Sequence, residues 1–323
     1  MRIKYNILWF ENDQTSYETK KEFVKEILDK YGFDFPEPQH EVDGTNIDNL
    51  NFSNYDLIIA DMNLDKNQKA MELIDHIRKK SFTEVLFYSS SGEDAVRAEL
   101  TKYHIDGAYC SGRESIDFEE KVEGVIHTII KKTQDLTNLR GLVMAEVSEL
   151  DVMMEEIIKK YYIDKDSNSL EWKNFQSKII NKIQKDTKKK FIPKISKTEN
   201  NEEKVHCQKD CFHIWSKVES IDEIINEFEF DSSKKAHTIH EIAKQINMKD
   251  IFIFDEYNKN IIQVRNNLAH SKSEIKAGKE VLVTKKLGEI CFNQDSFIEI
   301  RKDIKKYREI FEEIEKKIQK NKG

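Results

Sequence analysis

The run Asp56-Leu-Ile-Ile-Ala-Asp61 places four apolar residues between two aspartates. An unbroken apolar run, in place of alternating polar and apolar residues, is typical of a parallel strand buried on both faces. Further short apolar runs lie at 7–10, 85–88 and around 108–110, with amphipathic helical patterns between them and again at about 117–132. We therefore expect an α/β domain over residues 1–135, a doubly wound parallel sheet of the (βα)5 kind.

Each of these runs ends in polar side chains. Glu11 and Asp13 follow the first run, Asp61 ends the run quoted above, and Ser89 follows the next. The carboxyl ends of parallel strands meet at one edge of a sheet, so these side chains should lie close together. Crowded carboxylates need a cation such as Mg²⁺ to stay ionised, which makes the three acids candidate metal ligands. The alternative is that such carboxylates only cap the following helices.

The order and spacing of these residues resemble a response-regulator receiver domain over about residues 4–133. In Asp61-Met-Asn-Leu64, the resemblance makes Asp61 the phospho-acceptor and Asn63 the residue whose backbone carbonyl binds the metal. Glu11 and Asn12 match the acidic pair after the first strand, with an amide at one position, and Ser89 matches the hydroxyl residue that binds the phosphoryl group. The resemblance implies Mg²⁺ in this domain and a cognate histidine kinase as partner.

After the last of these runs the chain departs from the receiver pattern. It reads Ser111-Gly112-Arg113 where the family has Lys-Pro. A phosphoryl group on Asp61 then lacks its usual cation unless Arg113 reaches it. Two interpretations stay open, a receiver switched by phosphorylation and a pseudo-receiver used for docking or dimerisation.

A second candidate site lies in Ile261-Ile-Gln-Val-Arg-Asn-Asn-Leu-Ala-His270. Read as a helix, the segment buries an apolar stripe and presents Arg265, Asn266 and His270 elsewhere. Arginine offers a fixed fork of donors to phosphate oxygens, and histidine gives or takes a proton near neutral pH. The pattern suits cleavage of a phosphodiester. Cations at a helix end also complement the helix dipole, which is the purely structural interpretation.

The spacing Arg265-Asn266-(three residues)-His270, late in a helical segment, resembles the signature of the HEPN family. That resemblance implies a helical bundle over residues 138–323 and a metal-independent endoribonuclease that acts on RNA as a homodimer. Arg265, Asn266 and His270 would be its catalytic residues. HEPN nucleases often act in bacterial stress responses or phage defence, so the resemblance also suggests those settings.

The rest of the second half fits a helical bundle. Apolar positions from Leu139 to Ile158 follow helical spacing, and Glu146 and Glu149 fall on the side predicted to be solvated. Runs at 281–284 and 289–292 predict a small β-hairpin insert, and 297–317 predicts a long closing helix.

Two cysteines and two histidines fall within eight residues of one another, at His206, Cys207, Cys211 and His213. These are residue types that bind zinc, but structural zinc sites draw their ligands from two separate knuckles. The alternative is that Cys207 and Cys211 pack inward on a helix. A zinc ion here stays an open possibility.

Composition bounds the class of protein. The chain has 323 residues, of which 38% are hydrophobic and 35% charged, with only 10 glycines and 3 prolines. This profile favours a helix-rich globular protein of two domains, with no apolar run long enough for a membrane span. Four unevenly spread cysteines predict a reducing, cytoplasmic location.

Charge differs between the two halves. Residues 1–137 carry 17 lysines and arginines against 27 aspartates and glutamates, whereas the remaining residues carry 36 against 33. The weakly basic second half permits contact with RNA. The sequence thus predicts an endoribonuclease controlled by a receiver-like domain. The alternative is a non-catalytic signalling adaptor, in which the receiver docks a partner and the helical domain dimerises or binds RNA.

Overall fold

The computed structural model describes residues 3–43, 45–64, 77, 83–102, 104, 105, 107–133, 135–162, 170, 173, 174, 177, 178, 181, 230–276, 279–284, 288–291 and 293–320. The chain forms two compact units. The first unit comprises Met1–Leu142, Ser273–Val283 and Leu287–Lys302. The second unit comprises Val143–Lys272, Thr284–Lys286 and Asp303–Gly323.

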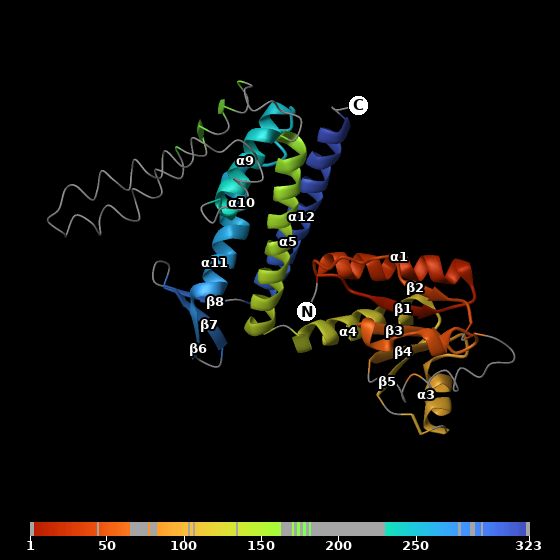
Figure 1. Cartoon of the computed structure of the whole chain (residues 1–323). Helices are drawn as coiled ribbons and strands as arrows, with labels where there is room; N and C mark the ends of the chain where they lie inside the picture. The colour runs from red at the N-terminus through yellow and green to blue at the C-terminus, as the bar shows by residue number, and fades with distance from the viewer. Residues whose placement is uncertain are drawn as a thin grey trace. The chain divides into compact units, whose positions relative to one another are not determined.

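The first unit is built on a five-stranded parallel sheet (Figure 1). Its strands are β1 (Ile7–Phe10), β2 (Gln39–Glu41), β3 (Leu57–Asp61), β4 (Glu84–Ser89) and β5 (Ala108–Gly112). They lie in the order β2-β1-β3-β4-β5, with every neighbouring pair parallel. This is the strand order of doubly wound, flavodoxin-like folds, to which receiver domains conform. The predicted α/β fold class of this half is confirmed.

Helices cover both faces of this sheet, because successive strand residues point to opposite sides. Trp9, Leu86 and Tyr88 belong to one apolar core, together with buried residues of α1 (Gln14–Lys30) and α4 (Ser115–Thr133). Leu8 and Phe87 belong to the other core, which is completed by Val96 and Leu100 of α3 (Glu93–Lys102). Two short 3₁₀ turns, at Ile47–Asn49 and Phe52–Asn54, precede β3.

The described part of the second unit is mainly helical. Its elements are α5 (Leu136–Tyr162, from Val143), α9 (Ser232–Gln245), α10 (Phe254–Tyr257), a π-helical turn η3 (Asn258–Ile262), α11 (Gln263–His270) and α12 (Gln294–Lys320, from Asp303). Four aromatic rings, Phe252, Tyr257, Tyr307 and Phe311, contact one another in its core. A helical second half is therefore confirmed at the level of secondary structure. No described helix is long and apolar enough to cross a membrane.

A small sheet completes the described chain. Its strands are β6 (Lys272–Lys276), β7 (Lys279–Thr284) and β8 (Gly288–Cys291), in the order β6-β7-β8. The predicted hairpin is present as β7 and β8. The third strand, β6, follows α11 directly and was not predicted. Its sequence, Lys272-Ser-Glu-Ile-Lys276, is mostly polar, and buried and exposed residues do not alternate along it.

A close backbone approach occurs at Gly32 in the first unit. Gly32 has a φ of +75°, and a Cβ there would lie 3.0 Å from Cβ of Arg301 and 3.1 Å from the carbonyl oxygen of Ile298. Arg301 is fully buried, donates from Nε to the carbonyl of Tyr31 at 2.8 Å, and lies 4.5 Å from the centre of the Phe33 ring. Only glycine fits both the backbone conformation and the space.

We predict that Gly32→Ala lowers the free energy of unfolding by about 1–3 kcal/mol, since it combines a left-handed backbone with steric overlap. Gly124→Ala is the matched control, because Gly124 lies exposed in α4 with nothing within 4 Å of an added Cβ. That change should raise stability by about 0.5–1 kcal/mol. Urea unfolding of both variants measures the effect, and equal stability of the two would contradict the packing described for Gly32.

Candidate functional site

Asp61 lies at the carboxyl end of β3 and is completely buried. Its Oδ1 accepts a hydrogen bond from the backbone N–H of Asn63 at 3.0 Å. Burial raises the pKa of Asp61 above its ordinary value of 3.8, against the lowering effect of the Asn63 N–H. The negative charge of Glu11 raises it further, while Arg113 and Lys20 lower it.

Glu11, at the end of β1, is also completely buried and fully engaged. Its Oε2 accepts from the hydroxyl of Tyr88 at 2.7 Å, and that hydroxyl in turn accepts from Nε1 of Trp9 at 3.2 Å. Its Oε1 accepts from the backbone N–H of Asp13 at 2.9 Å. The carboxylate is thus held by the core as well as by its neighbours.

Asp13 both caps a helix and belongs to the cluster of acids, the two alternatives that the sequence left open. As the N-cap of α1, it accepts through Oδ1 from the backbone N–H groups of Thr15 and Ser16, each at 3.1 Å. Its Oδ2 faces Arg113, at 3.3 Å from Nη2. One oxygen caps a helix while the other belongs to the pocket.

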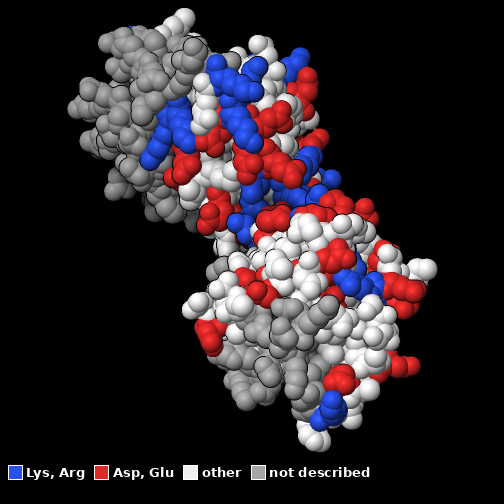
Figure 2. Space-filling model, turned by 90° about the vertical axis from the view of Figure 1, so that its right-hand side faces the viewer, with Lys and Arg blue, Asp and Glu red and all other residues white. Residues whose placement is uncertain are grey.

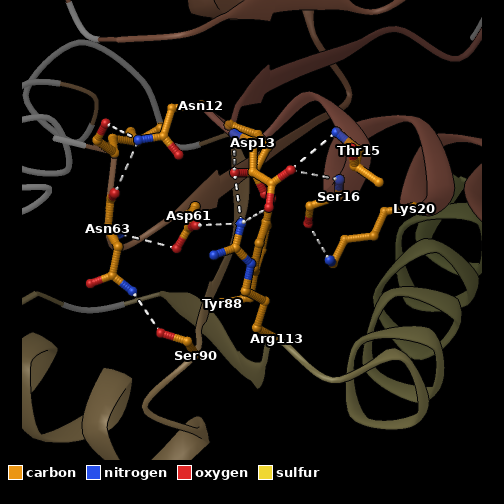
Figure 3. Close-up of polar contacts among 12 residues, drawn as sticks. Asn12, Asp13, Thr15, Ser16, Lys20, Asp61, Asn63, Tyr88, Ser90 and Arg113 are labelled. Carbon is orange, nitrogen blue, oxygen red and sulfur yellow. Dashed lines mark hydrogen bonds and ion pairs between the residues drawn. The ribbon is translucent and has the colours of Figure 1, made fainter.

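Arg113 reaches into this group, as Figure 3 shows. Its Nη2 lies 3.1 Å from Oε1 of Glu11 and 3.5 Å from Oδ2 of Asp61, besides its contact with Asp13. Ser111, which stands where receivers have lysine, is buried, and its hydroxyl donates to the carbonyl of Gly112 at 3.0 Å. The positive charge beside the carboxylates therefore comes from Arg113, which lies two positions after Ser111.

Lys20 of α1 lies near the same carboxylates and was not singled out by the sequence. Its Nζ donates to the hydroxyl of Ser16 at 2.6 Å and lies 5.2 Å from the centre of the Tyr88 ring. Burial lowers the pKa of Lys20, and the charge of Glu11 raises it. Helical spacing alone does not distinguish Lys20 from the other lysines of α1.

Asn63 and Ser89 complete the edge of the sheet. Nδ2 of Asn63 donates to the hydroxyls of Ser89 at 3.2 Å and Ser90 at 3.3 Å. The backbone carbonyl of Asn63, which the receiver resemblance makes a metal ligand, accepts from Nδ2 of Asn12 at 3.3 Å. The structure thus gathers all five residues predicted for this site: Glu11, Asp13, Asp61, Asn63 and Ser89.

A magnesium ion does not fit this pocket as it is arranged. Magnesium requires near-octahedral oxygen ligands at about 2.0–2.1 Å. Here a guanidinium nitrogen already lies between the three carboxylates, and the carbonyl of Asn63 already accepts a hydrogen bond. Among the described residues, no group of three or more His, Cys, Asp and Glu side chains is arranged to hold a metal ion.

The second candidate site lies on α11, directly after the π-helical turn. Nη2 of Arg265 donates to the hydroxyl of Ser232 at 3.3 Å, and that hydroxyl donates to Oδ2 of Asp151. Within the described part of the chain, three buried polar atoms have no hydrogen-bond partner: Nε of Arg265, Oδ1 of Asp151 and the hydroxyl oxygen of Tyr257. Burial raises the pKa of Asp151, which the hydroxyl of Ser232 and the charges of Lys235 and Arg265 oppose.

The structure does not bring Arg265 and His270 into contact. His270 is exposed and is the last residue of α11, and Asn266 is exposed as well. Ser271, which follows, has an extended backbone. Arg265, in contrast, is half-buried against its own unit.

Asp151, Ser232 and Tyr257 were missed by the sequence analysis. A signal existed only for Asp151, which shares a helical face with the buried residues Val147 and Met154. The prediction for Glu146 was wrong, because the sequence placed this residue on a solvated face of the helix. It is buried and pairs with Arg308, since α12 supplies a cation that helical spacing in α5 alone does not show.

The candidate zinc residues His206, Cys207, Cys211 and His213 lie outside the described residues. That prediction stays open.

Comparisons with known proteins identify no family. No family model matches the chain, and no curated protein matches it. One matching solved structure is a segment of the yeast Spc42 trimeric coiled coil fused to another protein, 20% identical over 41% of this chain and 80% of that one, with a TM-score of 0.29. Another is the N-terminal domain of a response regulator/sensory box/GGDEF protein from Carboxydothermus hydrogenoformans, 21% identical over 39% and 91%, with a TM-score of 0.28.

These likenesses are too low to carry an argument about the site. The description of the first unit as receiver-like rests instead on its strand order and on the acids at its strand ends.

The raised pKa of Asp61 predicts a pH dependence of stability. Because the folded pKa lies above 3.8, folding disfavours the ionised form, and the contribution of Asp61 is lost as pH rises from about 3.8 through the folded pKa. We predict that wild type loses stability relative to Asp61→Asn over that window.

Asp43 supplies the control for this experiment. It is partly exposed, and hydrogen bonds from Thr45 lower its pKa, so its contribution to stability is lost as pH falls. Urea unfolding between about pH 3 and 7 should give opposite slopes for the Asp61→Asn and Asp43→Asn differences. Slopes of the same sign would contradict the desolvation of Asp61.

Proposed function

We propose that this chain is a metal-independent endoribonuclease of the HEPN type, in which Arg265 and His270 of α11 act on RNA under the control of the receiver-like first unit. The observation that carries the proposal is the state of Arg265. Its guanidinium donates to the hydroxyl of Ser232, which in turn donates to the half-buried carboxylate of Asp151, while the histidine of the same motif is exposed at the end of the helix. An oriented cation and an accessible proton-transfer group on one helix suit phosphodiester cleavage if a second copy brings them together.

The backbone of this segment supports the proposal. Five π-helical residues precede α11, and such turns occur mostly as single insertions in helices, often at functional sites. α11 ends at His270, so no further helical turn covers the imidazole.

In the proposed reaction, His270 takes the proton of a ribose 2′-hydroxyl. The 2′-oxygen then forms a bond to phosphorus, and the bond from phosphorus to the 5′-oxygen breaks, with that oxygen receiving a proton from an imidazolium. Arg265 stabilises the charge that builds on the phosphate oxygens. The products are a 2′,3′-cyclic phosphate and a 5′-hydroxyl.

A second copy of the chain would complete the site. Residues five apart on a regular helix point about 140° away from each other, so Arg265 and His270 of one α11 do not converge readily. In a symmetric dimer, the same surface of each copy meets the other. Two copies would supply two imidazoles, one as base and one as acid.

Charge on its own does not mark a path for RNA. Figure 2 shows lysines and arginines interspersed with acidic residues over the face that it draws. The proposal therefore depends on the α11 residues and not on a basic surface.

The first unit would regulate this activity. α5 has residues in both units, up to Leu142 in the first and from Val143 in the second, within one continuous helix. A change in the first unit therefore has a covalent helical route to the second. The signal would be phosphorylation of Asp61 by a histidine kinase or the docking of a partner.

The second candidate function is a non-catalytic adaptor. It is favoured by the contact of Arg265 with Ser232, which lies within the same unit and could serve folding alone. The variants described next separate the two functions.

We predict that Arg265→Ala and His270→Ala each lower RNA cleavage by at least about a hundredfold, because each removes a group that acts on the reacting phosphate. Cleavage by the wild type should persist in EDTA. The measurement is the appearance of cyclic-phosphate ends on labelled RNA. Gln263→Ala, an exposed change on the same helix, is the control and should cleave as wild type does.

Absence of cleavage by the wild type, or full activity of His270→Ala in a folded protein, would exclude the nuclease and leave the adaptor. Circular dichroism and gel filtration would establish folding and the dimer.

We further predict that Asp151→Asn and Ser232→Ala lower kcat by about ten- to a hundredfold with little change in KM, because a loosened Arg265 is misplaced at the reacting phosphate. The pH profile set by His270 should not move. Ser148→Ala, an exposed hydroxyl on α5, is the control. A changed KM with an unchanged kcat would show that this pair does not position Arg265 for chemistry.

A further inference from the structure

We propose that Arg113 is the resident cation of the acidic pocket at the sheet edge, in the place that a divalent metal would otherwise take. The inference concerns the first unit and does not rest on the proposed nuclease function. It follows from which atoms of the pocket are already engaged.

One nitrogen of Arg113 serves all three carboxylates. Its Nη2 lies 3.1 Å from Oε1 of Glu11, 3.3 Å from Oδ2 of Asp13 and 3.5 Å from Oδ2 of Asp61 (Figure 3). The acids come from the ends of β1 and β3, so the cation joins two neighbouring strands. A shared position between carboxylates from different strands is where a bridging metal ion would also have to lie.

The backbone of Arg113 is anchored at the same edge. Its N–H donates to the carbonyl of Ser89 at 2.8 Å, directly after β5. Because that hydrogen bond fixes the start of the side chain, the guanidinium is directed at the pocket and is not a chance contact of a long surface residue. The side chain keeps only 25% of its exposure.

The other oxygens of the pocket are already occupied by donors. Oε2 of Glu11 accepts from Tyr88, and Oδ1 of Asp61 accepts from the Asn63 N–H. Asn12 donates to the backbone carbonyls of Asn63 and Leu64, at 3.3 and 2.5 Å. A magnesium ion shared by the three carboxylates would have to take the position of Nη2 and displace Arg113.

Charge leads to the same conclusion. Three carboxylates carry three negative charges, and Arg113 with the nearby Lys20 supplies two positive charges. A divalent ion entering beside both cations meets repulsion as well as attraction. Arg113 and a divalent cation should therefore compete for the same position, and two of the three negative charges are balanced without metal. This favours the pseudo-receiver interpretation, in which the unit folds and docks without a metal.

The test is metal binding by the full-length protein, measured by calorimetric titration with MgCl₂ and MnCl₂. Arg113→Ala should bind either ion at least about tenfold more tightly than wild type, which corresponds to about 1.4 kcal/mol. Arg97→Ala is the matched control, since Arg97 is an exposed arginine of the same unit that pairs with Glu93, away from the three acids. It should bind as wild type does. Equal affinity of wild type and Arg113→Ala would overturn the proposal.

Stability gives a second readout in case Arg113→Ala folds poorly. Without metal, Arg113→Gln should melt below wild type, and millimolar Mg²⁺ should raise its Tm more than that of wild type. Asp13→Asn should partly restore the Tm of Arg113→Gln while lowering that of wild type, because asparagine keeps the helix cap and removes one carboxylate. If Mg²⁺ raises both proteins equally, or if Asp13→Asn lowers both equally, Arg113 is not the resident cation.

Discussion

The first unit depends on holding three carboxylates beside one another at the edge of its sheet. Glu11 and Asp61 have no exposed surface, and Asp13 lies next to them. Two like charges about 4 Å apart repel by about 4 kcal/mol at the effective dielectric constant of a protein surface, so an uncompensated group would protonate or separate. Arg113 contacts each of the three acids, and Tyr88 and backbone N–H groups share the remaining oxygens. The sheet brings the acids together, and the guanidinium reduces the repulsion between their negative charges.

In the five-stranded sheet, the sequence predicted the four strands that are made of apolar runs and missed β2. Apolar runs marked β1, β3, β4 and β5, because a central parallel strand must be apolar on both faces. β2 reads Gln39-His-Glu41 and carries no such run. Its place depends on pairing with β1 and on His40, whose Nε2 lies 2.7 Å from the carbonyl of Glu11 and whose ring stacks on Tyr17. Contacts of that kind link residues distant in the chain and leave no periodic pattern.

The same distinction applies to the candidate sites. Strand-end spacing predicted which acids would gather, because sheet topology determines where strand ends lie. It left open whether Arg113 would turn toward them, which depends on the backbone after β5. In the second unit, Ser232 lies 81 residues from Asp151, so no local pattern connects them. The π-helical turn before α11 also cannot be read from the spacing of apolar residues, although it changes the direction in which every later side chain of the helix points.

Three arginines show how the surroundings, and not the residue type, determine the role. Arg301 is fully buried and has no carboxylate partner among the described residues, and burial lowers its pKa to about 10. Its contact with the Phe33 ring and its hydrogen bond to the Tyr31 carbonyl indicate a structural role. Arg113 has three carboxylate partners and partial exposure, so its charge is compensated and it can be exchanged for another cation. Arg265 contacts a hydroxyl that is itself hydrogen-bonded to a carboxylate, and its Nε has no hydrogen-bond partner among the residues that the structure describes. A cation held in place but not neutralised by direct contact retains attraction for an anion, which is the property that a phosphate-binding residue needs.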